Sequence, residues 1–138
     1  MSRNLILSGL IFIIGISFSF TYTSDPNCDK IKNGRFYYIS KQLNDTIDIV
    51  RSDSIQLEMN NQRIYISKSK IIWQSDCSYI MYINSLTDTK LSKFDSMIAK
   101  MPVNVKILSV DKTYYVAYTS LTIMNDKIES KDTIYFRK

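Results

Sequence analysis

Residues 103–124 of this chain read VNVKILSVDKTYYVAYTSLTIM. Apolar and polar side chains alternate on either side of Asp111-Lys112, a pattern typical of two antiparallel strands joined by a tight turn. Short alternating runs of the same kind also occur at 35–40, 46–51, 54–59, 63–67, 70–74, 77–83 and 128–136. Because Asn, Asp and Ser separate these runs, the sequence predicts a mainly β domain.

In residues 87–101 the apolar period changes to intervals of three and four. The residues concerned are Leu91, Phe94, Ile98 and Met101. This spacing predicts one short amphipathic helix, which Pro102 ends because proline disfavours the α conformation in the residue before it. About eight strands with this helix predict an antiparallel curved sheet or an open barrel. A two-sheet β-sandwich would bury the same faces equally well, so both architectures stay open.

Side chains two residues apart in a strand share a face, and we expect the apolar faces to form the core. These faces consist of Ile47 and Ile49, of Ile55, Leu57 and Met59, of Ile64 and Ile66, and of Cys77, Tyr79, Met81 and Ile83. Phe36, Trp73 and Tyr79 are the aromatic residues assigned to the structural core. Trp73 precedes Cys77 by four positions, so we expect it to pack near that cysteine.

The composition excludes several kinds of catalytic site. The 138 residues contain no histidine, which excludes Ser-His-Asp and Cys-His catalytic arrangements and imidazole metal ligands. Two of the three glycines lie in the apolar N-terminus, and Gly34 alone cannot form a nucleotide-binding turn or a phosphate-binding loop. We therefore expect no metal site and no cofactor.

Residues 1–23 are predicted to be a signal peptide. Arg3 carries one positive charge, and residues 5–20 follow without a charged side chain, as in the apolar core of an export signal. The run is also close to the ~20 residues that span a bilayer, so an uncleaved membrane anchor stays open. Residues 24–138 form the single predicted domain, in the periplasm, at the cell surface or secreted. Its cations are scattered singly among acidic residues, which argues against a nucleic-acid partner.

Export would place Cys28 and Cys77 where disulfides persist, and these are the two cysteines of the chain. The simplest interpretation is one intrachain bond. In the chain-entropy treatment, a bond closing a loop of this length stabilises the fold by roughly 4 kcal/mol. Redox catalysis is disfavoured because no Cys-x-x-Cys pair is present.

Tyrosines form adjacent pairs at Tyr37-Tyr38 and Tyr114-Tyr115. Because neighbouring strand residues face opposite sides, one tyrosine of each pair can join the core while the other joins an exposed aromatic strip. Such a strip would suit stacking on a sugar or a protein partner. Cross-strand packing alone would also explain the tyrosines.

The carboxylates are spread along the chain, and their closest groupings are Asp45 with Asp48, Asp53 with Glu58, and Glu129 with Asp132. A glycosidase-like site needs two carboxylates that face one cleft. The sequence places no pair in that way, and turn chemistry accounts for most of the aspartates.

Several of these residues carry a resemblance to a family of small exported proteins of Bacteroidota. The matching positions are Cys28, Gly34, Phe36, Arg51, Glu58 and the segment Trp-x-x-Asp-Cys-x-Tyr at 73–79. Some members of that family bear the label DNA topoisomerase IV, whose reaction requires a large DNA-gate enzyme with an ATP-binding partner. A domain of this size does not fit that label. Many members carry a lipid-attachment cysteine before the first paired cysteine, whereas residues 21–25 contain none.

The resemblance also implies a modification, because exported proteins of this phylum are often O-glycosylated where Asp precedes Ser or Thr and an apolar residue. Four tripeptides fit this pattern, and their acceptor residues are Thr46, Ser54, Ser96 and Thr133. We expect glycosylation at one or more of them.

Together these observations predict an exported, disulfide-linked, non-enzymatic β domain that acts as a binding or interaction module. The expected partner is an envelope protein, a glycan or an apolar ligand, and membrane contact is expected only through an uncleaved N-terminus. Two alternatives stay open. One is a carrier of a lipid or other apolar small molecule inside a barrel. The other is a small enzyme that uses carboxylates and tyrosines.

Overall fold

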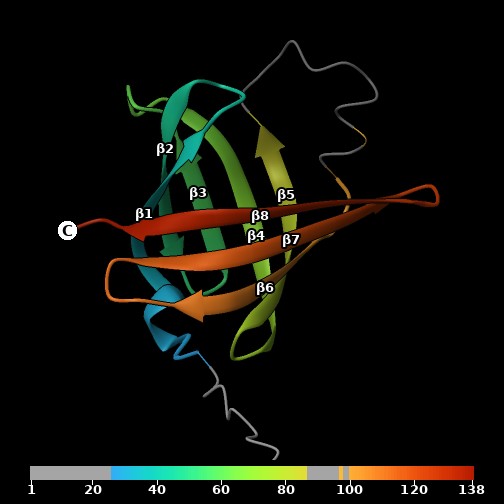
Figure 1. Cartoon of the computed structure of the whole chain (residues 1–138). Helices are drawn as coiled ribbons and strands as arrows, with labels where there is room; N and C mark the ends of the chain where they lie inside the picture. Colours follow the sequence, from blue (N-terminus) through green and yellow to red (C-terminus); the bar gives the residue numbers. More distant parts are fainter. Residues whose placement is uncertain (1–25, 87–96, 98–99) are drawn as a thin grey trace, which may run out of the picture.

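The computed structural model describes residues 26–86, 97 and 100–138 (Figure 1). The elements are the 3-10 helix η1 (Asp29–Ile31) and the strands β1 (Asn33–Ser40), β2 (Asp45–Ser52), β3 (Ile55–Met59), β4 (Tyr65–Ser75), β5 (Ser78–Leu86), β6 (Val103–Val110), β7 (Tyr114–Ile123) and β8 (Asp126–Phe136). The predicted signal peptide and nearly all of the predicted amphipathic helix at 87–101 lie outside the described residues.

Each strand pairs antiparallel with the next one along the chain, and β8 returns to β1 to close the sheet into a barrel. The closing pairs join Phe36 to Phe136 and Tyr37 to Tyr135. The prediction of a mainly antiparallel β domain is therefore confirmed. The barrel is closed rather than open, and the two-sheet sandwich is wrong, because the first and last strands pair with each other.

One strand replaces two that the alternation predicted. The run at 70–74 and residues 65–67 of the run at 63–67 belong to the single strand β4. Ser67 at the end of the first run and Ser69 between the two runs face the interior, with 5% and 1% of their surfaces exposed. Polar residues between apolar runs indicate a turn in a sequence, but serine is small enough to sit inside a barrel whose remaining space larger side chains fill.

The apolar faces expected for β3 and for the residues around the beginning of β4 are also corrected. Ile55 and Ile64 are exposed, whereas Gln56 is buried. Pairing explains the inversion, since Gln56 and Glu58 lie opposite Arg51 and Ile49 of β2 and therefore share their inward face. On β2 itself, the expected burial of the isoleucines at 47 and 49 is confirmed.

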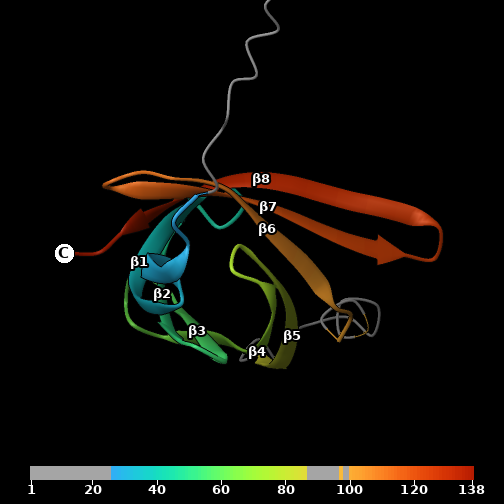
Figure 2. The same ribbon diagram turned by 90° about the horizontal axis from the view of Figure 1, so that it is seen from below.

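Helix η1 lies across one end of the barrel beside β1 and β2 (Figure 2). Its Ile31 is fully buried and belongs to the main core cluster. That cluster also contains Cys28, Phe36, Ile49, Ile71, Tyr79, Val105, Ile107, Tyr115, Ala117 and Ile134. This end of the barrel is thus filled by side chains from η1 and from most of the strands.

The hairpin of β7 and β8 extends beyond the barrel wall (Figures 1 and 2). Its paired residues run without a register shift from Tyr114 and Tyr135 to Ile123 and Asp126. Residues 126–133 of β8 are all exposed. The hairpin therefore presents much of its surface outside the barrel core.

Candidate binding site

Three tyrosines form a strip on the outer face of β1, β8 and β7. The rings of Tyr37 and Tyr135 stack with centroids 5.1 Å apart, and Tyr114 lies 6.2 Å from Tyr135. We call Tyr37, Tyr114 and Tyr135 the tyrosine strip. Their partners in the adjacent pairs turn inward, since Tyr115 is fully buried and Tyr38 packs against the core. The division of each tyrosine pair between two faces is confirmed.

Arg137 extends the tyrosine strip by one cation. Its guanidinium carbon lies 4.4 Å from the ring centroid of Tyr37, within the range of a cation–π interaction. Its Nε and one terminal nitrogen both donate to Oδ1 of Asp48, at 2.9 and 2.6 Å. Its backbone N–H donates to the carbonyl oxygen of Arg35 at 2.9 Å. Arg137 is thus held in place on the barrel wall.

A groove of about 580 Å³ lies beside Arg137. Its lining includes side chains from β1 and β2, the turn between β3 and β4, and the C-terminal residues. We call it the basic groove because its charged lining residues are Arg35, Arg63, Arg137 and Lys138 against the single acid Asp48. Asp48 already accepts from Arg137, and neither Arg35 nor Arg63 has a carboxylate partner among the described residues. The groove therefore carries cations available to a ligand.

Arg63 occupies a backbone position at which glycine would be favoured. It follows Asn60 in the turn between β3 and β4, where its N–H donates to the carbonyl oxygen of Asn60 at 2.9 Å. Its φ is 60°, and a left-handed conformation costs a residue with a side chain about 1–2 kcal/mol relative to its usual backbone. The turn thus presents a cation at the groove at some cost to stability, a pattern often found at functional sites.

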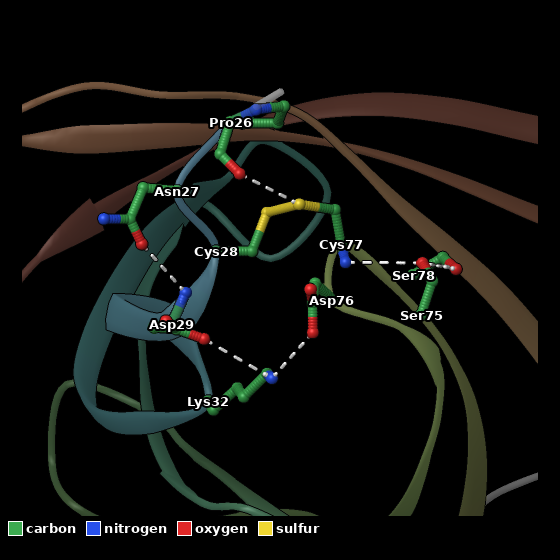
Figure 3. Close-up of a disulfide and its surroundings, with 9 residues drawn as sticks. All are labelled: Pro26, Asn27, Cys28, Asp29, Lys32, Ser75, Asp76, Cys77 and Ser78. Atoms are coloured by element: carbon green, nitrogen blue, oxygen red, sulfur yellow. Dashed lines mark hydrogen bonds and ion pairs between the residues drawn. A yellow bond between two sulfur atoms is a disulfide. The ribbon is translucent and has the colours of Figure 1, made fainter. Parts of the chain in front are cut away.

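The predicted disulfide joins Cys28 to Cys77, 49 residues apart (Figure 3). It ties the segment before η1 to the turn between β4 and β5. Lys32 lies between Asp29 and Asp76, with nitrogen–oxygen distances of 3.5 and 3.4 Å, and bridges the same two segments. The bond and this ion pair hold η1 against the end of the barrel.

We call the end of the barrel covered by η1 the plugged end. The aromatic residues expected in the core lie around it. Phe36 and Tyr79 are buried, whereas Trp73 is half-buried at the edge of the core, 4.8 Å from the ring of Tyr79. The indole N–H of Trp73 donates to the carbonyl oxygen of Asp53, and Lys32 lies 5.5 Å from the indole ring. Trp73 therefore packs at the edge of the core instead of filling its centre.

Arg51 is a buried arginine that the hydrophobic pattern did not indicate, with 3% of its surface exposed. It donates to the carbonyl oxygen of Ile31, to Oε1 of Gln56 and to the hydroxyls of Tyr79 and Tyr115, at 2.7 to 3.1 Å. Its guanidinium also lies 5.2 Å from the ring of Phe36. Arg51 connects η1 to four strands, so it acts in the scaffold.

Gln56 connects this arginine to the carboxylate of Glu58, which accepts from Nε2 of Gln56 at 2.7 Å and from the Tyr38 hydroxyl at 3.2 Å. Burial raises the pKa of Glu58, although these two hydrogen bonds and the charge of Arg51 act in the opposite direction. Burial also raises the pKa of Tyr38, with the nearby Glu58 as a further cause, and it raises the pKa of Tyr79 to about 12. The interior thus holds a carboxylate bonded to a tyrosine, with both groups committed to partners.

The residues that carry the sequence resemblance meet at the plugged end. Gly34 pairs with Arg51 across β1 and β2 and has a φ of 139°, and a Cβ at this glycine would lie 3.3 Å from Cζ of Phe36. Arg51 and Glu58 are joined through Gln56 as described above. These positions therefore build the scaffold, and Phe36 among them also lines the basic groove.

The candidate acceptors of O-glycans occupy different environments. Ser54 lies exposed in the turn between β2 and β3, and Thr133 is exposed on β8. Thr46 on β2 is partly buried, and Ser96 lies outside the described residues. Glycosylation stays a prediction at all four positions.

Within residues 26–86, 97 and 100–138, no group of three or more acidic or cysteine side chains is arranged to hold a metal ion. The same part of the chain contains no helix long and apolar enough to cross a membrane. Comparison with known protein families, with curated proteins and with solved structures finds no significant match in any of the three.

Proposed function

We propose that this protein is an exported, non-enzymatic binding module that recognises an anionic glycan with the tyrosine strip and the basic groove. The observation that carries the proposal is the continuity of the two features. Arg137 contacts the ring of Tyr37 on one side and lines the groove on the other. One ligand could therefore stack on tyrosine and meet cations at the same time.

The chemistry of the site suits a sugar chain with carboxylate or sulfate groups. The apolar face of a sugar ring packs on a tyrosine ring, and guanidinium groups bind carboxylates with paired hydrogen bonds. Arg35 and Arg63 are placed to form such bonds at the groove. The volume of about 580 Å³ lies within the range of sites that hold small ligands.

The disulfide supports export, because such bonds persist in oxidising compartments outside the cytoplasm. A glycan of the cell envelope or the surroundings would be available there. For this reason we favour a glycan over a nucleic acid, which would also suit aromatic rings and cations.

The packing of the interior favours an external ligand over an apolar molecule carried inside the barrel. Phe36 and Tyr115 are fully buried, with ring centroids 5.6 Å apart. Ile31 from η1 closes this end of the interior. A carrier would require open apolar volume at this place.

The test is a calorimetric titration with oligomers of a polyuronate, with a neutral glucan of the same length as the reference ligand. We expect binding of the uronate oligomer, weakened by added salt because the contacts are ionic. Arg137→Ala should weaken binding about tenfold, equivalent to about 1.4 kcal/mol. Lys70→Ala, an exposed lysine on β4, is the matched control and should bind like the wild type.

Arg63→Gly separates binding from stability. Glycine relieves the positive φ, so this variant should be as stable as the wild type or more stable by about 1 kcal/mol. It should nevertheless bind the uronate oligomer several-fold more weakly. Equal affinity for the uronate and the neutral glucan, or unchanged binding in both arginine variants, would overturn the proposal. Tight binding of single-stranded DNA with no binding of the uronate would redirect it to a nucleic acid.

A further inference from the structure

The projecting hairpin of β7 and β8 leaves one edge of β8 open. Strand β1 pairs with β8 only at Tyr135 and Phe136. Among the described residues, no strand pairs with the outer edge of β8 between Asp126 and Ile134. An open strand edge offers unpaired backbone groups to another strand.

The pairing pattern shows which backbone groups point outward. The turn of the hairpin has two residues, because Ile123 pairs with Asp126, so this closing pair exchanges hydrogen bonds. The backbone groups of even-numbered residues of β8 therefore bond to β7, and those of odd-numbered residues point away from β7. Two backbone hydrogen bonds agree with this assignment. The N–H of Phe136 donates to the carbonyl oxygen of Thr113, just before β7, whereas the N–H of Arg137 donates to that of Arg35 in β1. The open groups belong to Lys127, Glu129, Lys131 and Thr133.

The side chains along this edge alternate in charge instead of repeating one sign. The segment 126–133 reads DKIESKDT and is exposed throughout. Edges that must stay unpaired are usually protected by inward or repelling charges, with lysine most common. Here the residues with open backbone groups carry positive, negative and positive charge in turn, at Lys127, Glu129 and Lys131. Such an edge repels a copy of itself in some registers and attracts it in others.

We infer that the outer edge of β8 pairs antiparallel with the same edge of a second copy of this chain, with the two-fold axis at Ser130. In this register each open residue of one copy meets an open residue of the other, so all the exposed backbone groups between Lys127 and Thr133 are used. Glu129 lies opposite Lys131 of the second copy, and the symmetry repeats this pair. Lys127 lies opposite Thr133 of the second copy.

The register whose two-fold axis lies one residue earlier is electrostatically unfavourable. A two-fold axis at Glu129 would place Glu129 opposite its own copy and Lys127 opposite Lys131 of the second copy. Like charges directly opposite each other destabilise a strand pair, whereas opposite charges stabilise it. Moving the axis to Ile128 would restore opposite charges but would bring the turn residues into the pairing and shorten it. The charge pattern thus selects the register centred on Ser130.

Sedimentation velocity of the intact, disulfide-bonded protein over a range of concentrations tests the inference. We expect a reversible dimer. Lys131→Glu should weaken the dimer at least fivefold, because both symmetric pairs become repulsive. The combined variant Glu129→Lys with Lys131→Glu should restore dimerisation, since the exchanged charges again lie opposite each other. Lys70→Glu on β4 makes the same charge change elsewhere and should leave the dimer unchanged.

A crosslinking experiment tests the register and does not depend on charge. Ser130→Cys should form a symmetric disulfide between copies under mild oxidation, because opposed residues in a non-hydrogen-bonded pair have Cα atoms about 4.5 Å apart. Asp132→Cys shares the face but lies away from the axis, and it should remain uncrosslinked. A monomer at all concentrations, equal effects of Lys131→Glu and Lys70→Glu, or equal crosslinking of the two cysteine variants would overturn the inference.

Discussion

Replacement of Arg51 by methionine is expected to destabilise the domain by about 3–5 kcal/mol. Methionine keeps the apolar stem of the side chain but provides no donors. The variant would leave the carbonyl oxygen of Ile31, Oε1 of Gln56 and two tyrosine hydroxyls without their donor. Each buried polar group that loses its partner costs about 1–3 kcal/mol.

The expected loss is smaller than four full penalties of this kind, because the tyrosine hydroxyls can redirect their own hydrogens to Gln56 in the variant and so leave fewer groups without a partner. The loss of the three aromatic contacts of the guanidinium adds to the cost. A value of 3–5 kcal/mol also matches the effect of removing one partner from a buried charged network. Such a loss is a large share of the 5–15 kcal/mol that typically stabilises a domain.

Urea unfolding followed by tyrosine and tryptophan fluorescence measures this effect. The control is Arg35→Met, which removes an exposed arginine from the neighbouring strand and should change the free energy of unfolding by less than about 0.5 kcal/mol. Arg51→Lys should recover part of the loss, because lysine keeps the charge but not the planar set of donors. If Arg51→Met unfolds within about 1 kcal/mol of the wild type, the network does not hold η1 to the barrel.

Three further predictions concern the plugged end. Burial raises the pKa of Glu58 above its usual 4.5, so the folded protein holds this proton more tightly than the unfolded chain, and stability should fall as pH rises from 4.5 through the folded pKa. Glu58→Gln should therefore be more stable than the wild type at pH 7 and should lose that advantage below pH 4.5. Urea titrations at the two pH values measure this difference, and an equal advantage at both would contradict the prediction. Gly34→Ala should lower stability by about 1–3 kcal/mol because its φ is 139° and its Cβ would crowd a buried ring, and an unchanged melting temperature would refute that. Cys28→Ser with Cys77→Ser should cost roughly 4 kcal/mol, measured against the oxidised wild type, whereas a reducing agent should leave the variant unaffected.

Local pattern was sufficient for several features of the candidate site. Adjacent strand residues face opposite sides whatever the fold, so the sequence alone predicts that Tyr37 and Tyr38 separate. The same rule separates Tyr114 from Tyr115. The sequence did not indicate that Tyr37, Tyr114 and Tyr135 meet, because only closure of the barrel brings β1 beside β8.

Arg63 and Arg137 were missed for a related reason. They are single cations far apart in the chain and resemble any solvated residue. One signal was present, since a turn without glycine at 60–64 requires some residue to take a strained conformation. That signal does not identify Arg63 as the residue concerned, or place it beside Arg137.

What the sequence determined by itself was the strand content, the antiparallel pattern and the pair of cysteines, because these depend on side-chain period and on residue type. The tertiary structure decided that the sheet closes, that Gln56 and Glu58 face inward, and that Ser67 and Ser69 continue one strand. Those features depend on pairing register, since a shift of one residue moves every side chain to the opposite face. Register is set by contacts between strands distant in the chain, and Arg51 shows the consequence. Its charge is tolerated in the interior because other strands bring oxygen atoms to it.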